Sequence, residues 1–181
     1  MYLIYMNKNI KHKNKKGFSI MEIIVYFAIL GIISVLVTDN IISLFKNYNI
    51  VRANQEIEYN AISILDKLTK DIKEAENVIL GQSSFSVPLG MVTLKIASST
   101  NGFITDTRKF YLNENRLKYD KNGVYFGDLS TKKVQVSNFK IYYITGTTTE
   151  AIKVELGIES KPNLNSSIIS KNFYTTIQLH Q

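Results

Sequence analysis

The sequence contains no cysteine, so no disulfide bond can stabilise it. Any folded domain must therefore be held together by the burial of apolar side chains alone. The chain has 181 residues. That length suits one long helix and one small domain with its own core, and it is too short for a multidomain enzyme.

Histidine is almost as scarce, with only His12 near the start of the chain and His180 next to its end. A histidine-based proton relay would have to depend on a frayed terminus. The sequence also lacks a GxSxG elbow, a phosphate-binding glycine loop and a cluster of metal ligands. We therefore expect no enzymatic activity, no cofactor and no metal. Asp120 and Asp128 are close enough in sequence to suggest a calcium site, but carboxylates in turns are usually only solvated.

Proline is rare too, and none occurs before Pro88, so nothing forces an early helix to end. The residues from Phe18 to Val37 are mainly apolar, and Glu22 is the only charged side chain among them. About 20 such residues are needed for an α-helix to cross about 30 Å of hydrocarbon. The segment is therefore predicted to be a transmembrane helix.

Glu22 is the informative residue of this segment. A carboxylate inside a membrane helix costs about 2.5–3.5 kcal/mol even on lenient scales, and it usually marks function. The alternative is an ordinary signal-anchor, in which Glu22 lies near the lipid headgroups at little cost.

The residues before the helix are strongly basic and contain no acid; their lysines are Lys8, Lys11, Lys13, Lys15 and Lys16. They account for most of the formal net charge of +7. The positive-inside bias keeps such a leader cytoplasmic and sends everything after Val37 to the other side of the membrane. A nucleic-acid-binding patch would need these lysines on a folded surface, so no direct nucleic-acid partner is predicted.

The residues Lys16-Gly17-Phe18-Ser19-Ile20-Met21-Glu22 resemble the processing motif of type IV prepilins and pseudopilins, a basic leader ending in glycine with a glutamate five residues later. The resemblance implies that a prepilin peptidase cuts between Gly17 and Phe18 and N-methylates Phe18. It also implies that Glu22 acts in assembly, by neutralising the N-terminus of an adjacent subunit. Asp39 stands about where major pilins often have a proline, which favours a minor subunit.

An amphipathic stripe continues after the membrane segment, with apolar residues at steps of three and four to about Ile79. Its second half, from Ile57 onward, is expected to be packing surface, and slight breaks at Asp39-Asn40 or Arg52–Asn54 fit the pattern. Four parts are therefore predicted. Residues 1–17 form a cleaved leader, 18–37 a transmembrane and polymerisation helix, 38–80 its amphipathic continuation, and 81–181 a β-rich globular domain.

The β-rich part contains short runs of β-branched and aromatic residues separated by turn residues. The predicted strands are Met91–Ala97, Lys109–Leu112, Arg116–Tyr119, Val124–Phe126, Lys133–Val136, Lys140–Thr145, Ile152–Ile158 and Phe173–Leu179. Asn113-Glu114-Asn115 and Lys121-Asn122-Gly123 are predicted to form tight hairpins. Alternation of apolar and polar residues indicates antiparallel strands with one solvent-exposed face.

A long helix followed by antiparallel strands resembles the pilin architecture. The expected fold class is α+β, with the first half of the helix transmembrane and the second half packed on an antiparallel β-sheet domain. Leu65–Val78 and Val136–Tyr143 are most similar to minor pilin W and minor pseudopilin J. The implied partners are a prepilin peptidase, other pilin or pseudopilin subunits, the membrane and an inner-membrane assembly machinery.

Two functions follow from these observations. The first is a minor pilin or pseudopilin, a structural subunit of a type IV pilus-like or type II secretion filament. The second is a membrane-anchored binding protein with an exported β-domain that never polymerises. Both place the chain in the cytoplasmic membrane as a single-pass protein with its leader in the cytoplasm, and the first can also place it in a filament.

Overall fold

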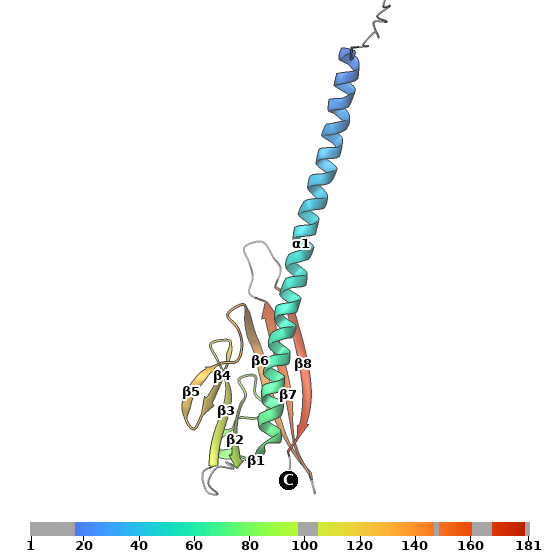
Figure 1. The fold of residues 1–181 in the computed structure, drawn as a ribbon. Coiled ribbons are helices and arrows are strands. Elements are labelled where there is room, and N and C mark those ends of the chain that lie inside the picture. The colour runs from blue at the N-terminus through green and yellow to red at the C-terminus, as the bar shows by residue number, and fades with distance from the viewer. Residues whose placement is uncertain (1–16, 98–104, 147–148, 161–167, 180–181) are drawn as a thin grey trace, which may run out of the picture. The chain divides into compact units, whose positions relative to one another are not determined.

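The computed structural model describes residues 17–97, 105–146, 149–160 and 168–179. Within these residues it contains one long helix, α1 (Ile20–Lys73), followed by the strands β1 to β8 and a short 3-10 helix, η1 (Leu80–Gln82), between β1 and β2 (Figure 1). The chain divides into two units, Met1–Phe45 and Lys46–Gln181. Apart from Gly17, the predicted leader lies outside the described residues.

Helix α1 continues through both places where the sequence allowed a break. The side-chain amides of Asn40 and Asn54 donate hydrogen bonds to backbone carbonyls four residues earlier, at 2.7 and 3.1 Å. These bonds give each of the two amide groups a hydrogen-bond acceptor within the helix itself. The polar stretches therefore interrupt the apolar stripe without interrupting the backbone.

The predicted end of the helix near Ile79 is wrong, because α1 ends at Lys73 and the next residues form strand β1 (Ala75–Val78). Ala75 and Val78 are both buried, as the helical spacing suggested. An irregularity in the pairing of β1 with β2, between Ala75 and Asn77, brings these two side chains to the same side of the strand. A spacing of three residues is thus produced by a bulged strand instead of a helical turn.

The first sheet has five antiparallel strands in the order β1-β2-β3-β4-β5. After β1, its strands are β2 (Met91–Ala97), β3 (Thr105–Asn113), β4 (Arg116–Lys121) and β5 (Val124–Asp128). Both predicted hairpins are confirmed. Glu114, Asn115, Asn122 and Gly123 all have φ between 52° and 76°, the left-handed values that two-residue turns need.

The second sheet has three antiparallel strands, β6 (Val134–Thr145), β7 (Glu150–Ser160) and β8 (Ser170–Gln178), in that order. The sequence suggested two strands, Lys133–Val136 and Lys140–Thr145, where the structure has only β6. The register of β6 shifts between Val136 and Asn138, and this lets Val136 and Phe139 both point into the core. The shift breaks the alternation of apolar residues, which is why one strand resembled two.

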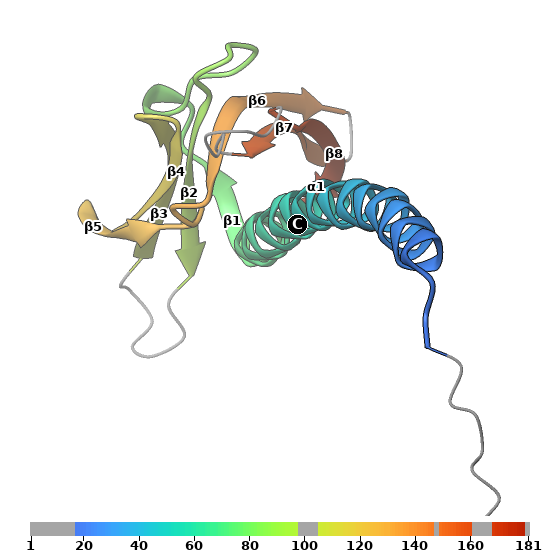
Figure 2. The same ribbon diagram turned by 90° about the horizontal axis from the view of Figure 1, so that it is seen from above.

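The β-rich domain consists of two antiparallel sheets that lie beside one another (Figure 2). The sheets meet where Leu89 bridges Phe139 and the Gly90 amide donates a hydrogen bond of 2.7 Å to the Phe139 carbonyl. A Cβ on Gly90 would stand 2.5 Å from that carbonyl oxygen, so only glycine allows this approach.

The second half of α1 packs on both sheets, as expected for an amphipathic helix beside a β-domain. Its core residues repeat at steps of three and four and are fully buried: Ile57, Ala61, Ile64, Leu68 and Ile72. They belong to the same core as β2 to β4 and β6 to β8. The fold is therefore α+β, with one long apolar helix packed on antiparallel sheets.

Asn60 is a buried polar residue within this apolar helix face. Its amide donates to the Glu56 carbonyl at 2.7 Å, and its carbonyl oxygen accepts the Thr131 backbone N–H at 2.8 Å. We expect Asn60→Leu to lower the free energy of unfolding by about 1–3 kcal/mol, because it removes the acceptor of the Thr131 N–H without changing the volume much.

Urea unfolding of detergent-solubilised protein, followed by near-ultraviolet circular dichroism of its tyrosines, measures this change. The control is Asn54→Ala, since among the described residues Asn54 bonds only to its own helix. A loss no larger for Asn60→Leu than for the control would show that Asn60 does not hold the segment before β6 to the helix.

Candidate functional site

The predicted cleavage point lies just before α1. Gly17, Phe18 and Ser19 precede the first helical residue. Apart from the two chain neighbours of Gly17, no atom of the described residues lies within 4 Å of the position that a Cβ on Gly17 would take, and Phe18 is 72% exposed. The Gly17–Phe18 peptide bond therefore lies in an open, non-helical stretch, the kind of backbone that proteases cut most readily.

Ser19 and Glu22 form part of a capping box at the start of the helix. The Ser19 backbone N–H donates to Glu22 Oε2 at 3.5 Å, and the Glu22 N–H donates to the Ser19 carbonyl at 3.0 Å. Ser-x-x-Glu is a sequence signature of such a box, so the pattern that indicated processing also encodes a helix start. Sequence reasoning missed Ser19, although its spacing from Glu22 was the available signal.

The capping contact leaves most of the Glu22 carboxylate free. An ionised carboxylate can accept about four hydrogen bonds, and from the described residues this one accepts a single bond at the upper limit of length. The side chain is exposed. The site can therefore hold a cation from outside the chain.

The large apolar side chains between residues 20 and 51 of α1 are exposed, in contrast to the buried stripe that begins at Ile57. Within the described residues, α1 is the one helix that is long and apolar enough to cross a membrane, and none of its most apolar stretch is buried. Exposed apolar surface of this extent must be covered by lipid or by other helices.

The two acids considered for calcium are engaged in other contacts. The Tyr111 hydroxyl donates to Asp120 at 3.2 Å. Asp128 accepts from the Tyr125 hydroxyl at 2.7 Å and from Arg116 at 2.9 Å. The Tyr125 hydrogen bond and then the Arg116 guanidinium lower the pKa of Asp128 below its usual value. Within the described residues, no group of three or more histidine or acidic side chains is placed to hold a metal ion.

Comparison with known proteins finds a similar fold in a solved structure. No protein-family model and no curated protein matches the chain. A type IV-like pilin from Thermus thermophilus has a similar structure, with a TM-score of 0.51 and 12% sequence identity. The alignment covers 71% of this chain and 97% of that pilin. At this identity the match concerns the fold, and it confirms that the α+β architecture is pilin-like.

Proposed function

We propose that the chain is a minor pilin or pseudopilin, a structural subunit of a type IV pilus-like or type II secretion filament. The observation that carries this proposal is the position of Gly17–Glu22. The motif lies at the first turn of an exposed apolar helix, and the same helix ends in a pilin-like fold.

The division of α1 into two halves supports a subunit that assembles through this helix. From Ile57 onward the apolar stripe is buried in the core of its own unit. Before that residue the apolar side chains have no comparable partner in the described part of the chain. In the precursor lipid would cover them, and in a filament the helices of other subunits would do so.

The proposed mechanism begins with cleavage between Gly17 and Phe18, which creates a new ammonium group on Phe18 beside the membrane. That group and Glu22 are both costly in hydrocarbon while they are unpaired. A subunit that enters in the correct axial register pairs its neighbour's ammonium with its own Glu22, and a wrong register leaves both charges unpaired. The charge pair would thus select the register of assembly.

The finer assignments belong to the same proposal. The resemblance of Leu65–Val78 and Val136–Tyr143 to minor pilin W and minor pseudopilin J favours a minor subunit, and Asp39 in place of a proline agrees with it. The partners would be a prepilin peptidase, other subunits and the assembly machinery of the inner membrane. The leader would stay in the cytoplasm, and everything after Val37 would be exported.

Intact-mass analysis tests the proposal directly. The chain is expressed with and without a prepilin peptidase and extracted from membranes, and its intact mass is measured by mass spectrometry. We expect the enzyme to remove Met1–Gly17 and to add one methyl group, and we expect Gly17→Val to block both changes. An unprocessed chain in the presence of an active peptidase would favour the membrane-anchored binding protein that never polymerises.

A further inference from the structure

Tyr26 is another polar side chain in the apolar part of α1, and nothing above assigns it a role. It follows Glu22 by four residues, so the two side chains share one face of the helix. A hydroxyl group in hydrocarbon must find a hydrogen-bond partner, because unpaired polar groups are costly there.

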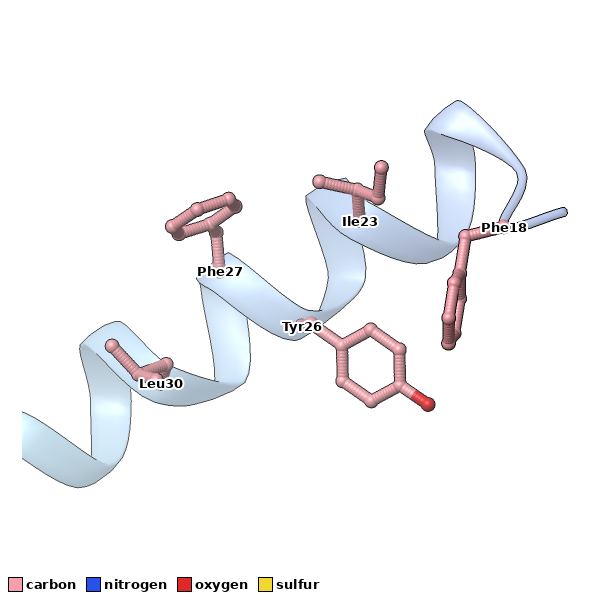
Figure 3. A pocket seen from close by; sticks show the side chains of 5 residues that line it. All are labelled: Phe18, Ile23, Tyr26, Phe27 and Leu30. Atoms are coloured by element: carbon pink, nitrogen blue, oxygen red, sulfur yellow. The ribbon is translucent and has the colours of Figure 1, made fainter.

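The Tyr26 ring is directed toward the start of the helix. It contacts the Phe18 ring edge to face, with centroids 6.3 Å apart and ring planes at 75°. Figure 3 shows both rings on the same side of the helix, with the Tyr26 hydroxyl turned toward Phe18, while Ile23 and Phe27 lie on the other side. This direction follows from the Cα–Cβ bonds of a helix, which tilt toward its N-terminus.

Within the described residues of its unit, 17–45, the Tyr26 hydroxyl makes no hydrogen bond. The side-chain hydrogen bonds between residues 17 and 45 involve Glu22, Ser34, Thr38 and Asn40, and Tyr26 takes no part in them. The Glu22 carboxylate, one turn earlier, also retains free acceptor positions. The Tyr26 hydroxyl, which is a hydrogen-bond donor, and the Glu22 carboxylate, which has free acceptor positions, thus lie on one helix face.

The expected cation does not saturate the carboxylate either. A singly methylated ammonium has two N–H donors, whereas a carboxylate offers about four acceptor positions. We propose that Tyr26 is a positioning residue of the assembly site. Its hydroxyl donates a hydrogen bond to the Glu22 carboxylate when the Phe18 ammonium of a neighbouring subunit sits on that carboxylate. This inference rests on the proposed function.

The hydrogen bond would fix the direction of the carboxylate. A glutamate side chain has several rotamers in an exposed first turn, and a neighbour's ammonium is paired well in few of them. A second donor from the same helix face restricts that choice before the neighbour arrives. The Phe18 ring, packed edge to face against Tyr26, keeps the hydroxyl near the start of the helix.

A competition experiment on the full-length chain tests this role. A tagged variant is expressed together with the untagged wild type and a prepilin peptidase, and the tagged fraction is measured in sedimented filaments and in the membrane. Tyr26→Phe is expected to reduce incorporation about three- to tenfold, which is the scale of one hydrogen bond within a membrane. Cleavage and methylation, followed by intact mass, should stay unchanged.

Three further variants separate positioning from a structural effect. Tyr26→Trp keeps a ring N–H donor and should restore much of the incorporation. Tyr48→Phe removes a hydroxyl from an exposed tyrosine outside the predicted membrane segment and should have no effect. In a Glu22→Gln background, Tyr26→Phe should cause a much smaller further loss, because its acceptor is no longer a charged carboxylate.

Full incorporation of Tyr26→Phe would overturn the inference. The same loss with and without Glu22→Gln would also overturn it, because it would make Tyr26 an interfacial anchor that binds headgroups. These outcomes differ from failure of the proposed function itself. In that case the wild-type chain would stay uncleaved, or would be cleaved without entering filaments.

Discussion

Replacing Glu22 by alanine is expected to remove the chain almost completely from filaments while its leader is still cut and Phe18 is still methylated. The mutant leaves its neighbour's ammonium without a counter-charge in hydrocarbon. The cost of an unpaired charge there is about 2.5–3.5 kcal/mol, which corresponds to an about 100-fold loss of incorporation. Competition between tagged mutant and untagged wild type measures this ratio, and intact mass shows whether processing is complete.

The control must separate charge from helix capping, because Glu22 also bonds to the Ser19 N–H. Ser19→Ala removes the hydroxyl of the residue just before the helix, the position that a capping box assigns to serine or threonine, and leaves the carboxylate. It is expected to weaken only the first turn of the helix, by about 1 kcal/mol. If the two variants lost incorporation equally, capping would explain the effect of Glu22→Ala. Equal incorporation of Glu22→Ala and wild type would exclude the assembly role.

The second large effect is expected at Asp71, in the last turns of α1. Its side chain is fully buried and forms ion pairs with Lys67 at 3.0 Å and with Arg108 on β3. Arg108 also contacts Glu74 at 3.0 Å. These pairs join the end of the helix to the middle of the first sheet. One oxygen of Asp71 and Nε of Arg108 have no hydrogen-bond partner within the described residues. Losing one of the remaining contacts would leave further buried polar atoms unpaired and would lower the stability strongly.

We expect Asp71→Asn to lower the free energy of unfolding by about 3 kcal/mol. The substitution keeps the shape of the side chain but leaves the largely buried Arg108 guanidinium without its main counter-charge. Glu74 still forms an ion pair with Arg108. We therefore expect a loss of stability at the lower end of the range for a broken buried ion pair. Urea unfolding in detergent, followed by tyrosine circular dichroism, measures the difference.

Two variants show whether the unpaired charge is the cause. Glu58→Gln breaks a pair with Lys171 in which both side chains are exposed, and it should change stability by less than about 1 kcal/mol. Replacing Asp71 and Arg108 together by leucine and methionine should recover much of the loss, because no buried charge is then left unpaired and the former partners Lys67 and Glu74 are partly exposed. A double variant as unstable as Asp71→Asn would mean that packing, and not charge, matters here.

Local patterns in the sequence were sufficient for several parts of the protein. The hairpins at Glu114-Asn115 and Asn122-Gly123 were predictable because their left-handed backbone values are favoured by the turn residues themselves. The buried face of α1 from Ile57 to Ile72 was predictable because helical spacing alone aligns those residues.

Other elements were not predictable, because the same local pattern fits two structures. Ala75 and Val78 have a helical spacing, and only their pairing with β2 makes them a bulged strand. Val136 and Phe139 lie in one strand because β7 continues opposite both of them. No local signal joins Asp71 to Arg108, which are brought together by the packing of α1 on β3.

The sequence by itself determined the apolar helix, the position of Glu22 within it and the run of short strands. These features depend on residues that are neighbours in the chain, where length, charge and turn preference act directly. The tertiary structure alone decided where α1 stops, how the strands divide into two sheets and which charges are buried. Those outcomes depend on residues far apart in sequence, since burial and strand pairing each require two segments that come together in space.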